Sequence, residues 1–352
     1  MRTFDIVRKV LDISLLDILR IINRRFPIRV SHSMPSIEYC LSDYQIQLLE
    51  EMRRDVEHAG PPFKPSLRWR QELTGLFEKL FRIEGIQNPE DQEYNLRFSG
   101  FAPSDIRLHR YICWMYRSLL AKRDSLGLLS RLQATCKEGR GYGYRMENNF
   151  LSLDLLFSID DFYGLYELNP AVATDPLIIA DLGAGWGRLG YVLNHVNPQC
   201  TYIVFDLPEI LLISQTYLPT LFPNIVIQNY EQSRLLDRFK KQSLKSAHMW
   251  FLGPQDILKF DTASIDMIVN IGSFQEMPVD YISQYFRHFS RVAAGGCCFL
   301  RQLRDGKSQG QCLDEIPGLD FYQFPNYWKR RFLRSSTLSD EFFEAGFEIP
   351  PI

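Results

Sequence analysis

The densest group of residues able to do chemistry lies between Ile178 and Gly190, in the run IIADLGAGWGRLG. Read from Gly185, the run contains G-x-G-x-x-G, and read from Asp181 it contains D-x-G-x-G-x-G. A glycine-rich turn between a strand and a helix lets the backbone approach a ligand, and the helix start offers free N–H groups. The run therefore predicts a site for a nucleoside-containing ligand, and the pattern that applies decides which ligand.

The acid at the start of the run separates the two patterns. G-x-G-x-x-G is the signature of dinucleotide binding, whereas D-x-G-x-G-x-G is typical of S-adenosylmethionine (SAM) binding. A carboxylate directed into the turn repels a pyrophosphate but attracts the sulfonium and ammonium groups of SAM, by a few kcal/mol in a partly buried site. The sequence therefore predicts SAM as the cofactor, bound at Asp181, Gly183, Ala184, Gly185 and Gly187. NAD remains the alternative.

Two further strand ends carry polar residues that suit a nucleoside. Asp206, followed by Leu207, ends the next apolar run 25 residues after Asp181 and can accept hydrogen bonds from both ribose hydroxyls. This feature fits NAD as well as SAM. Gln255 and Asp256 follow a third apolar run, where an adenine amino group can be read, although Asp256 can equally cap a helix or turn.

The periodicity of the chain divides it into two parts. Helical patterns over residues 4–23, 43–58, 68–83 and 105–134 occupy the first part, and turn residues cluster at 137–149. Beyond them, apolar runs at 177–183, 200–208, 224–230, 247–254, 265–274 and 295–303 alternate with helical segments. We therefore predict a helical region over 1–138, which caps the site or forms a homo-oligomer, and an α/β domain over 139–352. Its sheet is expected to be Rossmann-like, doubly wound and mostly parallel.

Composition excludes several classes of protein. The formal net charge of −2 gives no indication of a nucleic-acid partner, and no apolar run approaches the roughly 18 residues of a membrane span. Seven cysteines without a C-x-x-C pair favour a reduced cytoplasm. Neither the histidines nor the aspartates show the spacing of a metal site, so we expect no metal.

The second part of the chain resembles the class I SAM-dependent methyltransferases, and more narrowly the family of sugar O-methyltransferases. The matching pieces are DLGAGWGRLG from Asp181, VFDLPE from Val204, VNIGSFQEMP from Val269, and FYQFPNYW from Phe321. The resemblance implies SAM as the methyl donor, a seven-stranded Rossmann-like sheet, and a hydroxyl of a sugar, nucleotide sugar or glycan as the acceptor. Alternatives are a different small-molecule acceptor or a binding protein without catalysis.

The C-terminus departs from the pattern of this family. The expected helix over 335–345 would end at the Gly346-Phe347 turn, and no room remains before Ile352 for the antiparallel seventh strand. Three explanations follow: the strand assignment is shifted by one, the sheet is completed differently, or the chain is truncated.

Methyl transfer to a hydroxyl requires donor and acceptor in line and a group that accepts the hydroxyl proton. The loop after the fourth apolar run offers Glu276 as general base, with Gln275 or Asn270 to orient a ligand. A carboxylate whose pKa is raised by partial burial can act near neutrality. Glu276 can instead cap a helix or pair with an arginine. His288, on a helical segment, is the rival base.

Aromatic and basic residues near the C-terminus are candidates for acceptor contacts. Tyr327 and Trp328, with Tyr322 and Phe324, can form an apolar platform for a sugar ring, although such clusters more often belong to a core. The basic stretch over 329–334 suits a nucleotide-sugar diphosphate, but a solvated helix face is the simpler interpretation.

Overall fold

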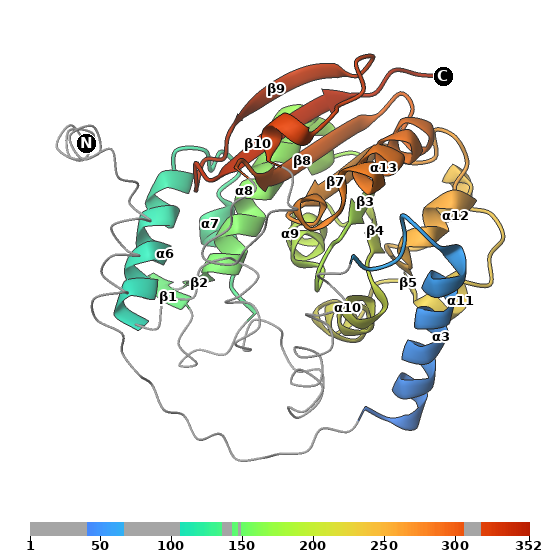
Figure 1. Cartoon of the computed structure of the whole chain (residues 1–352). Helices are drawn as coiled ribbons and strands as arrows, with labels where there is room; N and C mark the ends of the chain where they lie inside the picture. Colours follow the sequence, from blue (N-terminus) through green and yellow to red (C-terminus); the bar gives the residue numbers. More distant parts are fainter. Residues whose placement is uncertain (1–40, 67–105, 136–142, 147–148, 306–317) are drawn as a thin grey trace.

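The computed structural model describes residues 41–66, 106–135, 143–146, 149–305 and 318–352 (Figure 1). The helices predicted over 4–23 and 68–83 lie outside these residues. The helix over 43–58 is confirmed as α3 (Asp43–Ala59). The long helix predicted over 105–134 is instead broken into α6 (Ile106–Leu120) and α7 (Leu128–Arg131). The first helix ends at Leu120, and α7 begins after Gly127, which has a φ of +67°; the Asp124 carboxylate caps α7 by accepting from the Leu128 N–H at 2.7 Å.

An eight-stranded sheet forms the centre of the molecule. In spatial order its strands are β5 (Ile227–Gln228), β6 (Met249–Leu252), β4 (Thr201–Phe205), β3 (Ile178–Leu182), β7 (Met267–Ile271), β8 (Cys297–Leu303), β10 (Phe342–Glu348) and β9 (Lys329–Ser335). The first six are parallel, and β10 is antiparallel to both of its neighbours. The chain order reverses at β3, which makes the carboxyl end of β3 the point where a doubly wound sheet binds its ligand. The predicted Rossmann-like fold is confirmed.

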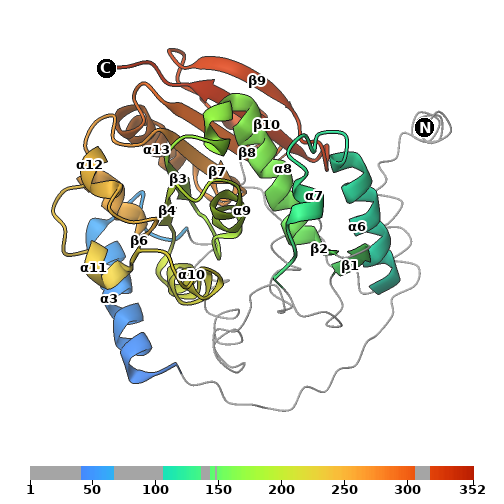
Figure 2. The same ribbon diagram turned by 180° about the vertical axis from the view of Figure 1, so that it is seen from behind.

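Helices cover both faces of the sheet, and each face has its own apolar core. Along β3 the side chains alternate, with Ile179 in one core and Ile178 and Ala180 in the other. Residues of α8 (Leu153–Leu168), α9 (Arg188–Val196) and α10 (Pro208–Leu221) line the first core, visible in Figure 2. The second core lies under α12 (Lys241–Leu244), η3 (Pro254–Lys259) and α13 (Val279–Val292); Figure 1 shows α12 and α13.

Shorter elements complete the described chain. They are the hairpin of β1 (Gly143–Met146) and β2 (Asn149–Ser152), the α-helical turn α11 (Tyr230–Ser233), and the 3-10 turns η2 (Pro170–Ala173), η4 (Phe274–Glu276) and η5 (Leu319–Phe321). The turns α11, η3 and η4 directly follow strands β5, β6 and β7. They therefore line the same edge of the sheet as the glycine-rich turn after β3.

The prediction for the C-terminus is wrong: the strand assignment was shifted by one. The basic stretch expected on a helix is the edge strand β9, and Gly346 lies inside β10 rather than in a turn. Carboxylates of β10 pair with the arginines of β9: Arg331 lies 2.9 Å from Glu348, and Arg334 lies 3.2 Å from Glu344. These cross-strand pairs stabilise an edge strand that is too basic to be predicted from its own sequence.

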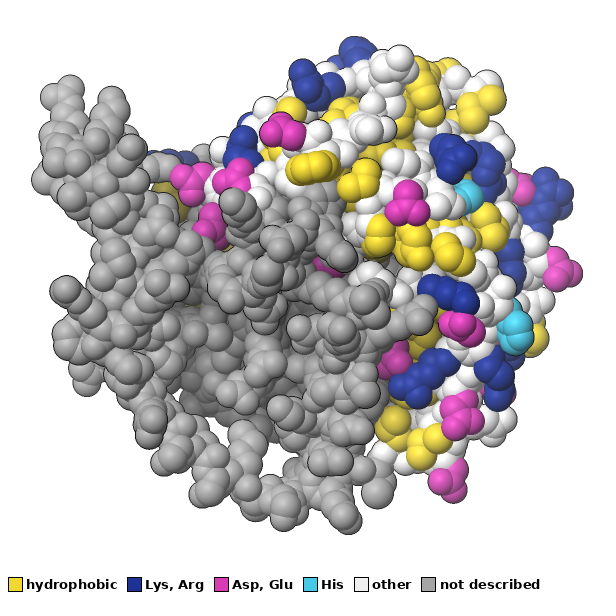
Figure 3. Space-filling view, viewed as in Figure 1, with side chains coloured by type: hydrophobic (Ala, Val, Ile, Leu, Met, Phe, Trp, Pro, Cys, Tyr) yellow, Lys and Arg dark blue, Asp and Glu magenta, His cyan; other side chains and the backbone are white. Residues whose placement is uncertain are grey.

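The described surface on the face shown in Figure 3 mixes basic, acidic and scattered hydrophobic side chains, and neither sign of charge predominates there. In the parts of the chain that the structure describes, no helix has both the length and the apolar character needed to cross a bilayer. Within the same residues, no three His, Cys, Asp or Glu side chains come together as metal ligands would.

Candidate functional site

The glycine-rich turn after β3 has one open position. Gly183, Gly185 and Gly187 all adopt positive φ, between +62° and +89°, which favours glycine. A Cβ on Gly183 would lie 2.3 Å from the Ser273 hydroxyl oxygen, so this glycine allows close packing of the turn on the end of β7. A Cβ on Gly185 would meet no atom within 4 Å among the described residues beyond its chain neighbours. Gly185 therefore marks the side of the turn that a ligand can approach.

The remaining glycines of the run serve packing. A Cβ on Gly187 would lie 2.7 Å from a methyl group of Leu218 on α10, and one on Gly190 would lie 2.3 Å from the Tyr202 ring on β4. The second and third glycines of the G-x-G-x-x-G pattern are thus covered by side chains. The second glycine of a dinucleotide fingerprint is the one that the pyrophosphate approaches, so this geometry fits the D-x-G-x-G pattern better.

Asp206, at the end of β4, faces the open position of the turn. Its carboxylate accepts hydrogen bonds from the N–H groups of Gly185 and Leu207, both at 2.7 Å. Burial raises the pKa of Asp206 to about 8 against the effect of these two donors, and the negative charges of Asp181 and Glu276 raise it further. The structure thus brings Asp206, Leu207 and Gly185 together.

Asp181 lies beneath the turn, whereas the sequence analysis expected its carboxylate to be directed into it. The side chain is buried, and it accepts a hydrogen bond from the Tyr202 hydroxyl at 2.6 Å. Burial raises the pKa of Asp181 to about 7, and Tyr202 and the nearby charge of Arg188 moderate the shift. The acidic side chain that stands beside the open turn is therefore that of Asp206.

Gln255 and Asp256 differ in what their side chains contact. Asp256 accepts from the Gly253 N–H at 3.0 Å and lies 2.9 Å from the Lys259 ammonium, so it caps η3. Gln255 folds back over Gly253 at the end of β6, and its Oε1 is buried without a hydrogen-bond partner among the described residues. Of the two, Gln255 retains an unused polar atom with which to read a base.

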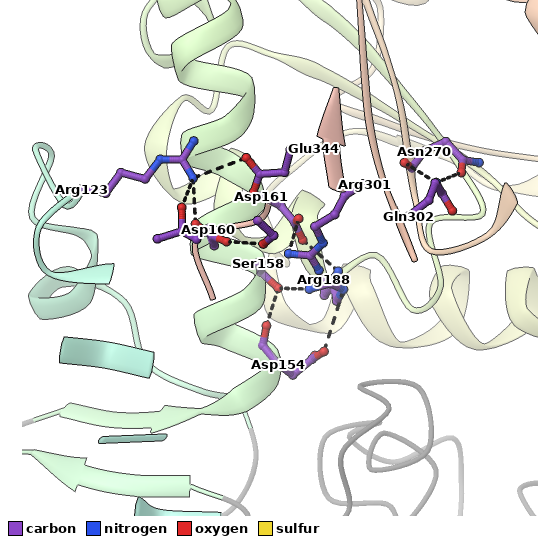
Figure 4. A network of polar contacts seen from close by, with 12 residues as sticks. Arg123, Asp154, Ser158, Asp160, Asp161, Arg188, Asn270, Arg301, Gln302 and Glu344 are labelled. Carbon is purple, nitrogen blue, oxygen red and sulfur yellow. Dashed lines mark hydrogen bonds and ion pairs between the residues drawn. The ribbon is translucent and has the colours of Figure 1, made fainter. Parts of the chain in front are cut away.

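Asn270 and Gln275 are engaged within the protein (Figure 4 shows Asn270 with Gln302). The Asn270 amide donates to the Leu182 carbonyl at 2.8 Å and accepts from the Gln302 amide at 2.6 Å. Gln275 Oε1 accepts from the Leu303 N–H at 2.7 Å. These amides tie together the carboxyl ends of β3, β7 and β8, so they shape the loop that presents Glu276.

Glu276 is the residue of this loop whose charge acts on other candidate groups. It ends η4 and is half-buried. Its negative charge raises the pKa of Asp206 and, after burial, that of Tyr322. Glu276 therefore lies within electrostatic range of both the predicted ribose-binding carboxylate of Asp206 and the buried phenol of Tyr322.

The rival base, His288, lies about two and a half turns along α13 from its first residue. Its ring packs at 5.9 Å from that of Phe63, on the outer side of the second core. Burial, together with the charges of Arg291 and Arg287, lowers its pKa. The structure does not bring His288 to the loop of Glu276.

The aromatic residues divide between core and surface. Trp328 is buried, donates from Nε1 to the Ser290 hydroxyl at 3.0 Å, and packs against Phe286 and Phe347. Tyr327 is 56% exposed, with its hydroxyl 2.8 Å from that of Ser290. Both are held against α13, which places Trp328 in the second core rather than on a free platform.

Helix α8, to which the sequence analysis assigned no element, anchors the glycine-rich turn (Figure 4). Arg188, the first residue of α9, contacts the buried Asp161 carboxylate at 2.9 Å and donates to the Ser158 hydroxyl at 3.2 Å. The Trp186 indole N–H donates to Asp154 at 3.0 Å. The adjacent residues Asp160 and Asp161 of α8 belong to no recognisable motif. The one sequence feature that indicated a buried acidic partner was Arg188, inside the glycine-rich run.

Helix α3 contributes polar contacts to the same edge of the sheet. Arg53 lies 2.8 Å from the buried Glu209 carboxylate at the start of α10, three residues after Asp206. Glu209 belongs to the VFDLPE piece, but its partner lies 156 residues away in the chain. Local sequence patterns therefore cannot predict that Arg53 and Glu209 form an ion pair.

Replacing Gly185 by alanine should weaken binding of SAM, the ligand predicted from the sequence, roughly tenfold while costing about 1–2 kcal/mol of stability. The Cβ would occupy the open side of the turn, and alanine is strained at a φ of +62°. Titration calorimetry with a parallel thermal melt measures both effects. Gly187→Ala is the matched control, because its Cβ would push against Leu218 and should reduce stability more than affinity. Unchanged affinity in Gly185→Ala would contradict the assignment of the open face.

Comparisons with known proteins found only distant structural likenesses. No family profile and no curated protein matches the chain. Among solved structures, a SAM-dependent methyltransferase from Aquifex aeolicus shares 13% identity over 53% of this chain and 87% of its own, with a TM-score of 0.37. A TehB-like SAM-dependent methyltransferase from Corynebacterium glutamicum shares 18% over 53% and 87%, with a TM-score of 0.34. A geranyl diphosphate methyltransferase in complex with SAM shares 11% over 55% and 87%, with a TM-score of 0.35. Likenesses this distant carry no weight for the activity, which we infer from the site itself.

Proposed function

We propose that this protein is a SAM-dependent methyltransferase. The observation that carries the proposal is the covered second glycine of the G-x-G-x-x-G pattern: a Cβ on Gly187 would lie 2.7 Å from Leu218, so the position that a pyrophosphate approaches in a dinucleotide-binding fold is closed. Asp206, held by the Gly185 N–H at 2.7 Å beside the open side of the turn, would bind the ribose of the nucleoside, a part that SAM and NAD share. The covered Gly190 fits either ligand, because the third glycine of a dinucleotide fingerprint also packs the helix against a strand.

The residues at the carboxyl edge fit the parts of SAM. Asp206 would accept hydrogen bonds from the ribose hydroxyls, and the unused Gln255 Oε1 would accept one from the adenine amino group. The open face at Gly185 would leave room for the ligand against the backbone. When bound, SAM would supply a methyl group on a sulfonium that is already activated by its charge.

We further propose that the acceptor is a hydroxyl of a sugar or glycoconjugate. Glu276 would accept the proton of this hydroxyl, since its half-buried carboxylate extends from the loop that follows β7. The hydrogen bonds of Asn270 and Gln275 would hold this loop still during the reaction. The choice of a sugar is supported by the sequence resemblance over the DLGAGWGRLG, VFDLPE and VNIGSFQEMP pieces.

Two experiments test these proposals separately. Calorimetry with SAM, S-adenosylhomocysteine and NAD should show binding of the first two and none of NAD. Incubation with methyl-labelled SAM and a panel of nucleotide sugars should label at least one of them. NAD binding in place of SAM would overturn the methyltransferase proposal. Label transfer to other small molecules but to no sugar would overturn only the choice of acceptor.

The affinity for S-adenosylhomocysteine should rise with pH through about 8. The pKa of Asp206 in the free protein is raised to about 8, and ribose hydroxyls donate to the charged carboxylate, so bound ligand lowers this pKa. Below pH 8 binding must then release a proton, and affinity should fall by up to roughly tenfold per pH unit. Calorimetry at pH 6.5 and 8.5, each in two buffers of different ionisation enthalpy, measures both effects. Equal affinity at both pH values, without proton release, would refute the prediction that Asp206 must ionise when the ligand binds.

A further inference from the structure

A relay of three side chains connects helix α3 to the loop after β6. The Tyr230 hydroxyl, on α11, lies 2.7 Å from the Asp55 carboxylate, on α3. The Gln255 amide nitrogen lies 3.4 Å from the same hydroxyl. Tyr230 is fully buried, so its hydroxyl depends on these two partners.

The direction of each hydrogen bond in the relay follows from the charge of Asp55. Burial raises the pKa of Asp55, but hydrogen bonds from Arg234 and Tyr230 outweigh it and hold the pKa below its usual value. An ionised carboxylate only accepts, so the Tyr230 hydroxyl must donate to it. The oxygen of that hydroxyl then accepts from the NH₂ group of Gln255. This contact sets which end of the Gln255 amide faces Tyr230, an orientation that distances alone do not reveal.

The relay leaves the oxygen end of the amide unused. Gln255 Oε1 is buried and has no hydrogen-bond partner among the described residues. The side chain lies over Gly253, one residue beyond β6, and Leu252 pairs in the sheet with Phe205, the residue before Asp206. A buried acceptor without a partner is costly, so the amide is prepared for a ligand that donates a hydrogen bond beside the ribose position.

We propose that Asp55 and Tyr230 are positioning residues that make the site selective for a base with an exocyclic amine, such as adenine, over one with a carbonyl at that position. An amine would donate to Gln255 Oε1, whereas a carbonyl would place two acceptors face to face. This inference rests on the proposed function, because it assumes that the nucleoside of SAM lies along this edge.

The test compares S-adenosylhomocysteine with S-inosylhomocysteine, which carries a carbonyl in place of the amine. In calorimetry, the wild-type protein should bind the adenine compound at least roughly tenfold more tightly. Binding of neither compound would overturn the proposed function and this inference with it. Equal binding of both would overturn the inference alone and leave the cofactor assignment in place.

The decisive variant is Tyr230→Phe, which removes the hydroxyl and keeps the ring. The Gln255 amide is then free to turn, and the preference should fall to roughly threefold or less. Asp55 retains its pair with Arg234 at 2.8 Å, so no buried charge is left alone. Should Tyr230→Phe melt far below the wild type, Asp55→Asn serves instead, because Tyr230 is then no longer forced to donate.

Tyr44→Phe is the matched control. It removes another tyrosine–carboxylate hydrogen bond made by α3, from the Tyr44 hydroxyl to Glu231 at 2.8 Å, in which Gln255 takes no part. This variant should keep the full preference for the adenine compound. A Tyr230→Phe protein that discriminates as well as the wild type and Tyr44→Phe would overturn the inference.

Discussion

Asp206→Ala should reduce the affinity for SAM by about 10²- to 10³-fold while leaving the protein folded. The carboxylate would make two charge-assisted hydrogen bonds to the ribose, each contributing about 1.5–3 kcal/mol, and part of this is offset by the cost of burying the charge. The free protein should tolerate the change because burial raises the pKa of Asp206 to about 8, so its ionised form is unfavourable there without a ligand. Calorimetry gives the affinity, and a thermal melt gives the stability.

Asp181→Asn is the control for this experiment. Asp181 is next to the glycine-rich turn in the sequence, whereas Asp206 contacts the turn in space. The Asp181 carboxylate is buried beneath the turn and hydrogen-bonded to Tyr202. This change should alter the melting temperature more than the affinity. If Asp206→Ala binds SAM normally and melts normally, the ribose is bound elsewhere and the proposed cofactor site is wrong.

Glu276→Gln should lower kcat by about 10²- to 10⁴-fold while leaving the affinity for SAM within a few-fold of the wild type. Glutamine keeps the size and the hydrogen-bonding reach of the side chain but cannot accept the hydroxyl proton. Steady-state kinetics with the acceptor identified from the panel, together with calorimetry, separates turnover from binding. The ratio of the two effects distinguishes a catalytic residue from one that only shapes the loop.

His288→Gln is the matched variant for the rival base. The His288 ring packs against Phe63 on the outer side of the second core, so its loss should change turnover by no more than about threefold. Normal turnover in Glu276→Gln combined with a large loss in His288→Gln would reverse the two assignments. The methyltransferase proposal itself would survive that result.

The strands were predicted from local patterns because each is a short, buried apolar run between turn residues. The runs at 177–183 and 295–303, for example, contain β3 and β8. The antiparallel end of the sheet was missed for the opposite reason. The arginines of β9 are stabilised by Glu344 and Glu348 on the neighbouring strand β10. Because this stabilisation comes from another strand, the sequence of β9 itself shows no alternation of apolar and polar residues that would predict a strand.

Helix α8 was missed because its pattern is not amphipathic. Nearly all of its residues are buried, including Asp160 and Asp161, whose charges are met by Arg123, Arg188 and Arg301. The periodicity of apolar residues identifies a helix that has one apolar, buried face and one polar, exposed face. Helix α8 has almost no exposed face, so its sequence lacks this periodicity. Its acids become recognisable only when their arginine partners are placed beside them.

The sequence by itself determined the alternation of strands and helices, the glycine-rich turn and the polar residues at the ends of β4 and β6, because these depend on neighbours within a few positions. Only the tertiary structure decided that Gly185 is the open glycine, that the Asp181 side chain lies beneath the glycine-rich turn, and that the Asp206 side chain faces this turn. It alone joined Asp55 to Tyr230 across 175 residues. The direction of a side chain is set by the groups packed around it in space, and their distances along the chain do not encode that packing.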